Sequence, residues 1–179
     1  MNLYPSERTA LFIDGANLYS TARALNIDMD FRRMLDFFRE RTILVRASYY
    51  TAVVEGEEFS AVRPLIDWLG YNGFAVVTKP AKRFTDADGH RRTKGNMDIE
   101  IAVDMLELAP RLDHVVLFSG DGDFKRLAQA VQAKGARFTA VSTLKSQPPM
   151  AADELRRQAD TFVDVADMLG EWARPKVAT

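Results

Sequence analysis

Short runs of consecutive apolar residues recur along the chain, and most of them contain valine, isoleucine or an aromatic residue. Runs of this kind, bounded by polar or glycine-containing segments, are typical of β-strands. Nearly all of them lack the alternation of polar and apolar positions found in half-exposed strands, so we expect both faces of the sheet to be covered. The predicted strands are Thr9–Ile13, Ile43–Thr51, Phe74–Thr78, His114–Phe118, Phe138–Ser142 and Thr161–Val165.

Segments with the period of an amphipathic helix lie between these strands. Asp30–Arg41, for example, places several apolar side chains on one face, among them Met34 and Phe38. Gly135 follows another such segment at the position of a C-cap glycine. Because strands that alternate with helices are typical of a parallel sheet with crossover connections, we predict an α/β fold. The predicted helices are Asp30–Arg41, Glu57–Tyr71, Lys94–Leu108, Asp123–Lys134 and Ala151–Ala159.

The composition is that of an ordinary globular chain: 179 residues, 47% apolar and 27% charged, with a formal net charge of -1. We expect one domain over residues 1–179, with a core from about 8 to 169. The chain has no cysteine, which excludes disulfides, zinc ribbons and thiolate catalysis. The first apolar run, Ala10–Ile13, is too short for a signal peptide, and no run is long enough to span a membrane. We therefore expect a cytoplasmic protein without a membrane partner.

Two aspartates follow predicted strands directly. Asp14 ends the first strand, and Asp121 comes just after His114–Phe118, each beside glycines that let a ligand approach the backbone. In a parallel α/β sheet the ligand site lies beyond the carboxyl ends of the strands, so both side chains are expected there. The alternative is that Asp14 caps a helix, and Asp123 has the same alternative, although capping is compatible with metal binding.

A third carboxylate, Asp98, shares a predicted helical face with apolar residues such as Ile101 and Met105. A carboxylate in such surroundings is unfavourable unless it is paired or bound to a metal. Lys94 lies four residues earlier, so an ordinary i,i+4 ion pair is an alternative. Glu100 is expected to point elsewhere and to be solvated, while Asp104 is left open.

A cluster of aspartates suits phosphodiester hydrolysis, because hard oxygen ligands bind Mg²⁺ or Mn²⁺, which polarise a phosphoryl oxygen and activate a water. A serine triad would need a histidine base, whereas His90 lies in a polar segment and His114 begins a strand. A haloacid-dehalogenase-like phosphatase also begins with an aspartate after the first strand, but it needs a second aspartate where this chain has Ala16. The aspartates therefore favour a nuclease.

Three motifs make the chain resemble a LabA-like NYN domain of the PIN-like superfamily, over about Arg8 to Leu169. They are Phe12–Leu18, Lys94–Gly95 with Asp98 and Asp104, and Ser119–Phe124. The resemblance implies a three-layer α/β/α sandwich with a mainly parallel sheet, and a Mg²⁺- or Mn²⁺-dependent ribonuclease in RNA processing or decay. It implies catalytic and metal-binding roles for four aspartates and supporting roles for three other residues: Asp14, Asp98, Asp121 and Asp123, with Asn17, Ser119 and Asp104.

The segment Lys79–Lys94 carries a net charge of +4, so the remainder of the chain is close to -5. A turn at Asp86–Gly89 predicts that Ala81–Arg92 is a hairpin or an extended arm. Because this arm directly precedes Asp98, we expect it to bind the phosphates of single-stranded RNA. The alternative is a solvated loop. The proposed RNA-binding residues are Lys82, Arg83, Arg91, Arg92 and Lys94. Two further alternatives stay open: an NYN domain that binds RNA or protein without cutting, and assembly into a homo-oligomer.

Overall fold

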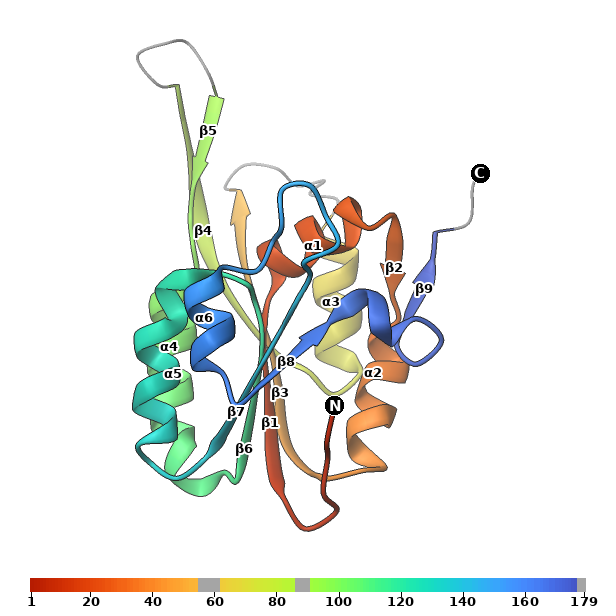
Figure 1. Cartoon of the computed structure of the whole chain (residues 1–179). Helices are drawn as coiled ribbons and strands as arrows, with labels where there is room; N and C mark the ends of the chain where they lie inside the picture. The colour runs from red at the N-terminus through yellow and green to blue at the C-terminus, as the bar shows by residue number, and fades with distance from the viewer. Residues whose placement is uncertain (55–61, 86–90, 177–179) are drawn as a thin grey trace.

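A central seven-stranded sheet organises the computed structural model, which describes residues 1–54, 62–85 and 91–176 (Figure 1). The strand order is β5-β4-β3-β1-β6-β7-β8, in which only β5 runs antiparallel to its neighbour. The strands are β1 Arg8–Asp14, β3 Ile43–Val54, β4 Ala75–Thr85, β5 Arg91–Lys94, β6 His114–Phe118, β7 Arg137–Ser142 and β8 Thr161–Asp164. All six predicted strands are therefore confirmed.

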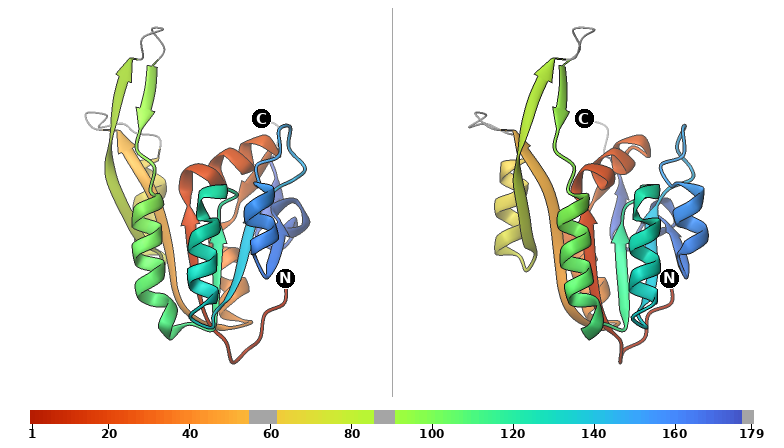
Figure 2. Two further views of the ribbon diagram at one scale, coloured as in Figure 1. Left: turned by 60° about the vertical axis from the view of Figure 1, so that its left-hand side comes forward. Right: turned by 90° about the vertical axis from the view of Figure 1, so that its left-hand side faces the viewer.

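Helices cover the sheet from both sides (Figure 2). One layer contains α1 Gly15–Ala24, α2 Phe31–Arg39 and α3 Arg63–Tyr71, and the other contains α4 Asp98–Leu108, α5 Lys125–Gln132 and α6 Asp153–Gln158. Three short 3₁₀ turns complete the connections: η1 Ala109–Arg111, η2 Gly122–Phe124 and η3 Val165–Met168. The expected three-layer α/β/α sandwich with a mainly parallel sheet is confirmed.

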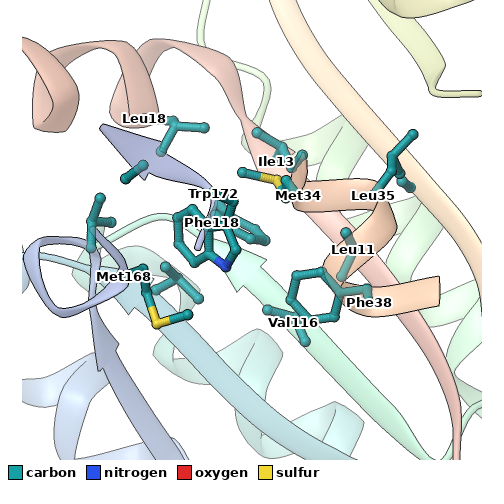
Figure 3. Packing of buried hydrophobic residues seen from close by; sticks show 14 of the residues in the cluster. Leu11, Ile13, Leu18, Met34, Leu35, Phe38, Val116, Phe118, Met168 and Trp172 are labelled. Carbon is teal, nitrogen blue, oxygen red and sulfur yellow. The ribbon is translucent and has the colours of Figure 1, made fainter. Parts of the chain in front are cut away.

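The two layers enclose separate hydrophobic cores, and β1 contributes to both. Leu11 and Ile13 face the core beneath α1, α2 and α3, while Ala10 and Phe12 face the core beneath α4, α5 and α6. All four side chains are at most 1% exposed. Trp172 fills the first core beside the sheet (Figure 3). Burial on both faces explains why the strand sequence shows no polar alternation.

Three predicted element boundaries differ from the structure. The helix expected from Lys94 begins only at Asp98, because Lys94 belongs to β5 and pairs with Lys82 of β4. The same pairing extends β4 to Thr85, well beyond the predicted end at Thr78. The helix expected over Glu57–Tyr71 begins at Arg63 within the described residues, and positions 57–61 lie outside them.

The pattern of apolar residues did not predict a second, small sheet. It pairs β2 Ile27–Met29 with β9 Ala173–Pro175, which closes the first core over Trp172 and Ala173. Strands of three residues are too short to show a period. No helix in the described part of the chain combines the length and the apolar character needed to cross a membrane.

Candidate metal centre

The order in which the chain adds strands to the sheet reverses between β1 and β6. From β1 the chain proceeds through β3 and β4 toward one edge, and from β6 it proceeds through β7 and β8 toward the other. The loops that leave β1 and β6 therefore diverge, which is where open α/β sheets bind ligands. Asp14 is the last residue of β1, and Ser119 and Asp121 follow β6 directly. The two strand-end motifs predicted to lie together are neighbours in space.

Three carboxylates converge at this point. Asp98, Asp121 and Asp123 each offer an oxygen atom, and these oxygens all lie within 4.8 Å of one another. Asp98 is the first residue of α4 and is half-buried, whereas Asp121 and Asp123 belong to the turn that begins α5 and are exposed. Asp121 also accepts the backbone N–H of Asp123 at 3.0 Å, which fixes the turn. Two separate elements thus supply one group of ligand atoms.

Asp14 is held firmly beside this group. Its Oδ1 accepts the backbone N–H of Asn17 at 3.1 Å, which makes it the N-cap of α1, and its Oδ2 accepts the Ser119 hydroxyl at 3.1 Å. Ser119 Oγ also accepts the N–H of Asp121 at 3.3 Å, and Asn17 Oδ1 accepts the N–H of Gly120 at 3.2 Å. The helix-cap alternative for Asp14 is therefore correct, and the same side chain also borders the acidic group.

Glycine at position 120 lets the loop after β6 pass close to its neighbours. A Cβ there would lie 2.1 Å from the carbonyl oxygen of Met150 and 2.5 Å from Ser142 Oγ. Gly15 is comparably enclosed, since a Cβ would lie 2.7 Å from the ring of Tyr49. Any larger residue at either position would displace the loop that carries an aspartate.

A cleft of about 460 Å³ opens over these carboxylates. Its lining combines Asp14, Asp98 and Asp121 with parts of α1, the end of β3 and the loop before α4. The other lining residues are Ala16, Asn17, Ser20, Thr51, Ala52, Gly95, Asn96, Met97 and Met150. Apart from Asn17, none of these residues was predicted from the sequence to belong to the site. Asn96 donates a hydrogen bond to Asp98 at 2.6 Å. Its position two residues before the aspartate is the sequence feature that could have identified it as a site residue.

Negative charge dominates the electrostatics of the cleft. Burial raises the pKa of Asp98, and the charges of Asp121, Asp14 and Asp123 raise it further, while Lys79 opposes them. Burial also raises the pKa of Asp14, against the lowering effect of its hydrogen bonds from Asn17 and Ser119. Carboxylates that repel one another and share ligand distances form a donor set that fits a hard divalent cation.

Comparison with known proteins agrees with this architecture. The model of the NYN domain matches residues 8–168, which span the sheet and every residue of the acidic group. The chain belongs to the NYN domain family. The family assignment made from the three motifs is thereby confirmed.

Two relatives of this NYN domain illustrate the similarity. The low amplitude and bright protein LabA of Synechococcus elongatus is 37% identical over 165 residues, covering 90% of this chain and 85% of LabA. The crystal structure of VPA0982, a protein of unknown function from Vibrio parahaemolyticus, superposes with a TM-score of 0.74 at 26% identity. That match covers 92% of this chain and 96% of VPA0982.

Two acidic residues of α4 point away from the cleft of this NYN domain. Asp104 accepts the Tyr50 hydroxyl at 2.9 Å and borders a separate hollow between α4, β3 and β4. Glu100, expected to be solvated, instead binds Lys79 of β4 through both oxygens, at 2.9 and 3.0 Å. Lys94 and Asp98 are not one helical turn apart, because α4 begins at Asp98. The helical i,i+4 geometry expected for that ion pair is therefore absent, while the side chain of Lys94 lies outside the described part of the chain.

The predicted arm is an antiparallel hairpin that extends beyond the helical layers (Figure 2). Lys82 and Arg83 lie on β4, and Arg91, Arg92 and Lys94 lie on β5. The backbone pairing runs from Lys82 with Lys94 to Thr85 with Arg91. The predicted turn falls at 86–90, outside the described residues. The hairpin backbone is confirmed, and its role in binding RNA stays a prediction.

Proposed function

We propose that this NYN domain is a metal-dependent ribonuclease that hydrolyses phosphodiester bonds of single-stranded RNA. The observation that carries the proposal is the convergence of Asp98, Asp121 and Asp123 within 4.8 Å, at the point where the order of added strands reverses. Asp14 lines the same cleft as Asp98 and Asp121. These four residues would hold Mg²⁺ or Mn²⁺, because both ions prefer carboxylate oxygens.

The bound cation would supply an activated water and charge stabilisation at the phosphoryl group. The protein supplies position. Ser119 donates to Asp14 Oδ2 while the backbone of Asn17 donates to Oδ1, so both oxygens of this carboxylate are oriented before any ligand arrives. Asn96 restrains Asp98 in the same way through its 2.6 Å hydrogen bond. Preorganised carboxylates lower the reorganisation needed in the reaction.

Cleavage of a labelled single-stranded RNA in Mg²⁺ or Mn²⁺, and its absence in EDTA, tests this proposal directly. Protein carrying Asp121→Asn, purified in the same way, controls for a contaminating nuclease. Equal cleavage with and without EDTA would contradict the metal mechanism. RNA binding without cleavage in either metal would support an NYN domain that only binds RNA. Double-stranded DNA is expected to be a poor substrate, by analogy with the family alone.

We also propose that the β4–β5 hairpin binds the RNA backbone. Its net positive charge stands against an acidic remainder, so we expect RNA phosphates to be attracted along this segment. Replacing Lys82, Arg83, Arg91 and Arg92 by alanine should raise KM, largely spare kcat and flatten the salt dependence of binding. A second variant removes the same charge from the α5–α6 layer as a matched control: Arg126, Lys134, Arg156 and Arg157 to alanine. Equal effects of the two variants would contradict a specific role for the hairpin.

A further inference from the structure

A second hollow lies on the other side of helix α1 from the acidic cleft. Helix α1 borders the cleft with Ala16, Asn17 and Ser20, and it borders the second hollow with Leu18, Tyr19, Ala22 and Arg23. This hollow, called the α1 groove below, has a volume of about 360 Å³. Its remaining walls come from β2, the start of α2, β3, α3 and the C-terminal segment: Ile27, Asp28, Met29, Phe31, Tyr49, Leu65, Arg174 and Lys176.

The floor of the α1 groove is apolar and aromatic. Tyr49 and Leu18 are buried beneath it, and Phe31 packs edge-on against Tyr49 with ring centroids 5.7 Å apart. Tyr19 stands at the rim with 66% of its surface exposed. A flat ring entering the groove would therefore meet an accessible aromatic face and a preformed apolar base.

The rim of the α1 groove carries more positive than negative charge. Arg23, Arg174 and Lys176 line it, against the single carboxylate of Asp28. Arg174 lies 3.9 Å from Asp30, which is a loose pair. Arg23 and Lys176 have no ion-pair partner among residues 1–54, 62–85 and 91–176. Two exposed cations thus border a groove in a chain whose net charge is negative.

We propose that the α1 groove binds a flanking nucleotide of the single-stranded RNA, with its base against Tyr19 and its phosphate near Arg23 and Lys176. Aromatic faces combined with cations are the means by which proteins bind single strands. A helix is about 10 Å across, so this nucleotide lies a few positions along the strand from the one in the acidic cleft. The proposal rests on the proposed ribonuclease function and assigns the path of its substrate over α1.

Binding of a fluorescent oligoadenylate of about twelve nucleotides, measured by anisotropy on an Asp121→Asn background that does not cut, tests this assignment. Tyr19→Ala should weaken binding about tenfold through loss of stacking, whereas Tyr19→Phe, which keeps the ring, should bind normally. The pair Arg23→Ala and Lys176→Ala should weaken binding and reduce the salt slope by roughly 1.4 units. Tyr71→Ala is the matched control, since Tyr71 is 91% exposed on α3 and does not line the groove.

The outcomes separate the groove from the ribonuclease activity. If the wild-type protein cuts RNA while Tyr19→Ala and the double variant bind as tightly as their parent, the groove assignment is wrong and the proposed function stands. If the wild-type protein does not cut, yet Tyr19→Ala and the double variant lose affinity while Tyr71→Ala does not, the groove stands and the ribonuclease proposal fails. If Tyr19→Ala weakens the binding of labelled poly-glutamate as much as it weakens that of the oligoadenylate, the assignment of a base to the groove is overturned, because poly-glutamate offers charge without bases.

Discussion

Charged side chains are arranged differently at the two ends of the parallel sheet. At the amino-terminal ends of the strands, two acids are paired with arginines: Arg8 binds Asp113 through two nitrogens at 2.9 and 3.0 Å, and Arg137 binds Glu7 at 2.7 and 2.8 Å. The contact with Arg8 lowers the pKa of Asp113 to about 2. At the carboxyl ends, Asp98 lies among other aspartates, and its pKa is raised.

This difference separates a stabilising end of the molecule from an end prepared for a ligand. The ion pairs at the amino-terminal ends connect β1 with β6 and β7, and their charges are balanced without a ligand. Mutual repulsion at the carboxyl ends is expected to make the folded chain less stable, and the proposed cation would relieve it; such strain is common where residues are selected for function. The same substitution made at the two ends should therefore have opposite consequences.

The largest expected effect is on activity at the carboxyl ends. Asp121→Asn and Asp14→Asn should each lower RNA cleavage by at least about 100-fold, because each removes a ligand charge from the cleft. Both should melt at an unchanged or higher temperature, since asparagine can still cap a helix and repulsion is relieved. Asp113→Asn is the matched substitution at the other end, and it should lower stability while sparing cleavage. Loss of stability in the first two variants would indicate a purely structural role.

The dependence of the free energy of unfolding on pH tests the amino-terminal ends of the strands through the protonation of His114. Burial, followed by the charge of Arg137, lowers the pKa of this side chain to about 4, although Glu7 and Asp160 oppose the shift. Above its ordinary pKa of 6.5, His114 is neutral in both the folded and unfolded chain and contributes nothing. Between 6.5 and 4 only the unfolded chain binds the proton, so the free energy of unfolding should fall by up to about 3 kcal/mol.

Urea unfolding at several pH values, on the wild type and on His114→Gln, measures this contribution. The difference in stability between the two proteins should change steadily as the pH falls from 6.5 to 4 and should be constant above 7. A difference that does not vary with pH would contradict the assignment of a depressed pKa to His114.

Divalent cations should bind at the carboxyl ends of the strands and thereby stabilise the folded protein. At a free Mn²⁺ concentration of 100 times its Kd, binding to the folded state alone adds about 2.7 kcal/mol to the free energy of unfolding. Thermal melts with and without Mn²⁺ should show this gain for the wild type and for Asp113→Asn. The double variant Asp98→Asn and Asp121→Asn should show little of it. An equal gain in that variant would place the metal elsewhere.

The smallest expected effect concerns the ion pair between Arg137 and Glu7. Arg137→Ala should reduce the free energy of unfolding by about 2 kcal/mol, because Glu7 is only 15% exposed and would lose its partner. RNA cleavage per folded molecule should be unchanged. Arg157→Ala removes a cation that is 78% exposed and should alter stability by less than about 0.5 kcal/mol. Chemical denaturation of the two variants side by side checks the contrast.

Local sequence patterns predicted the strands and the position of the site because both depend on short-range information. A buried apolar run identifies β1 and β6, and the rule that parallel strands end at one edge brings Asp14 and Asp121 together. The sheet order that makes β1 and β6 neighbours is itself a consequence of tertiary packing. The apolar face of the predicted helix indicated Asp98 as a third carboxylate, and the family resemblance added Asp123 to the group.

The partners of individual side chains could not be predicted in this way. Glu100 was expected in solvent, but Lys79 of β4 lies close enough to bind both of its oxygens. Asp104 has a helical position much like that of Glu100, yet it binds Tyr50 of β3. Such contacts depend on how α4 packs across the sheet, and the periodicity of the α4 sequence does not reveal this packing. The β2–β9 pair escaped prediction for the same reason, since it joins residues near the two ends of the chain.

The central place of β1 has a consequence for the order in which the molecule opens. Its residues Ala10–Ile13 bury side chains in both cores and bond to strands on either side, so no local fluctuation of one layer can expose their amides. In hydrogen-deuterium exchange these amides should be protected up to the free energy of global unfolding, while the β4–β5 hairpin should exchange early. Asp14 is thus attached to a strand that we expect to be among the last to lose its structure, and its carboxylate should lose its alignment only when α1 or the loop after β6 opens.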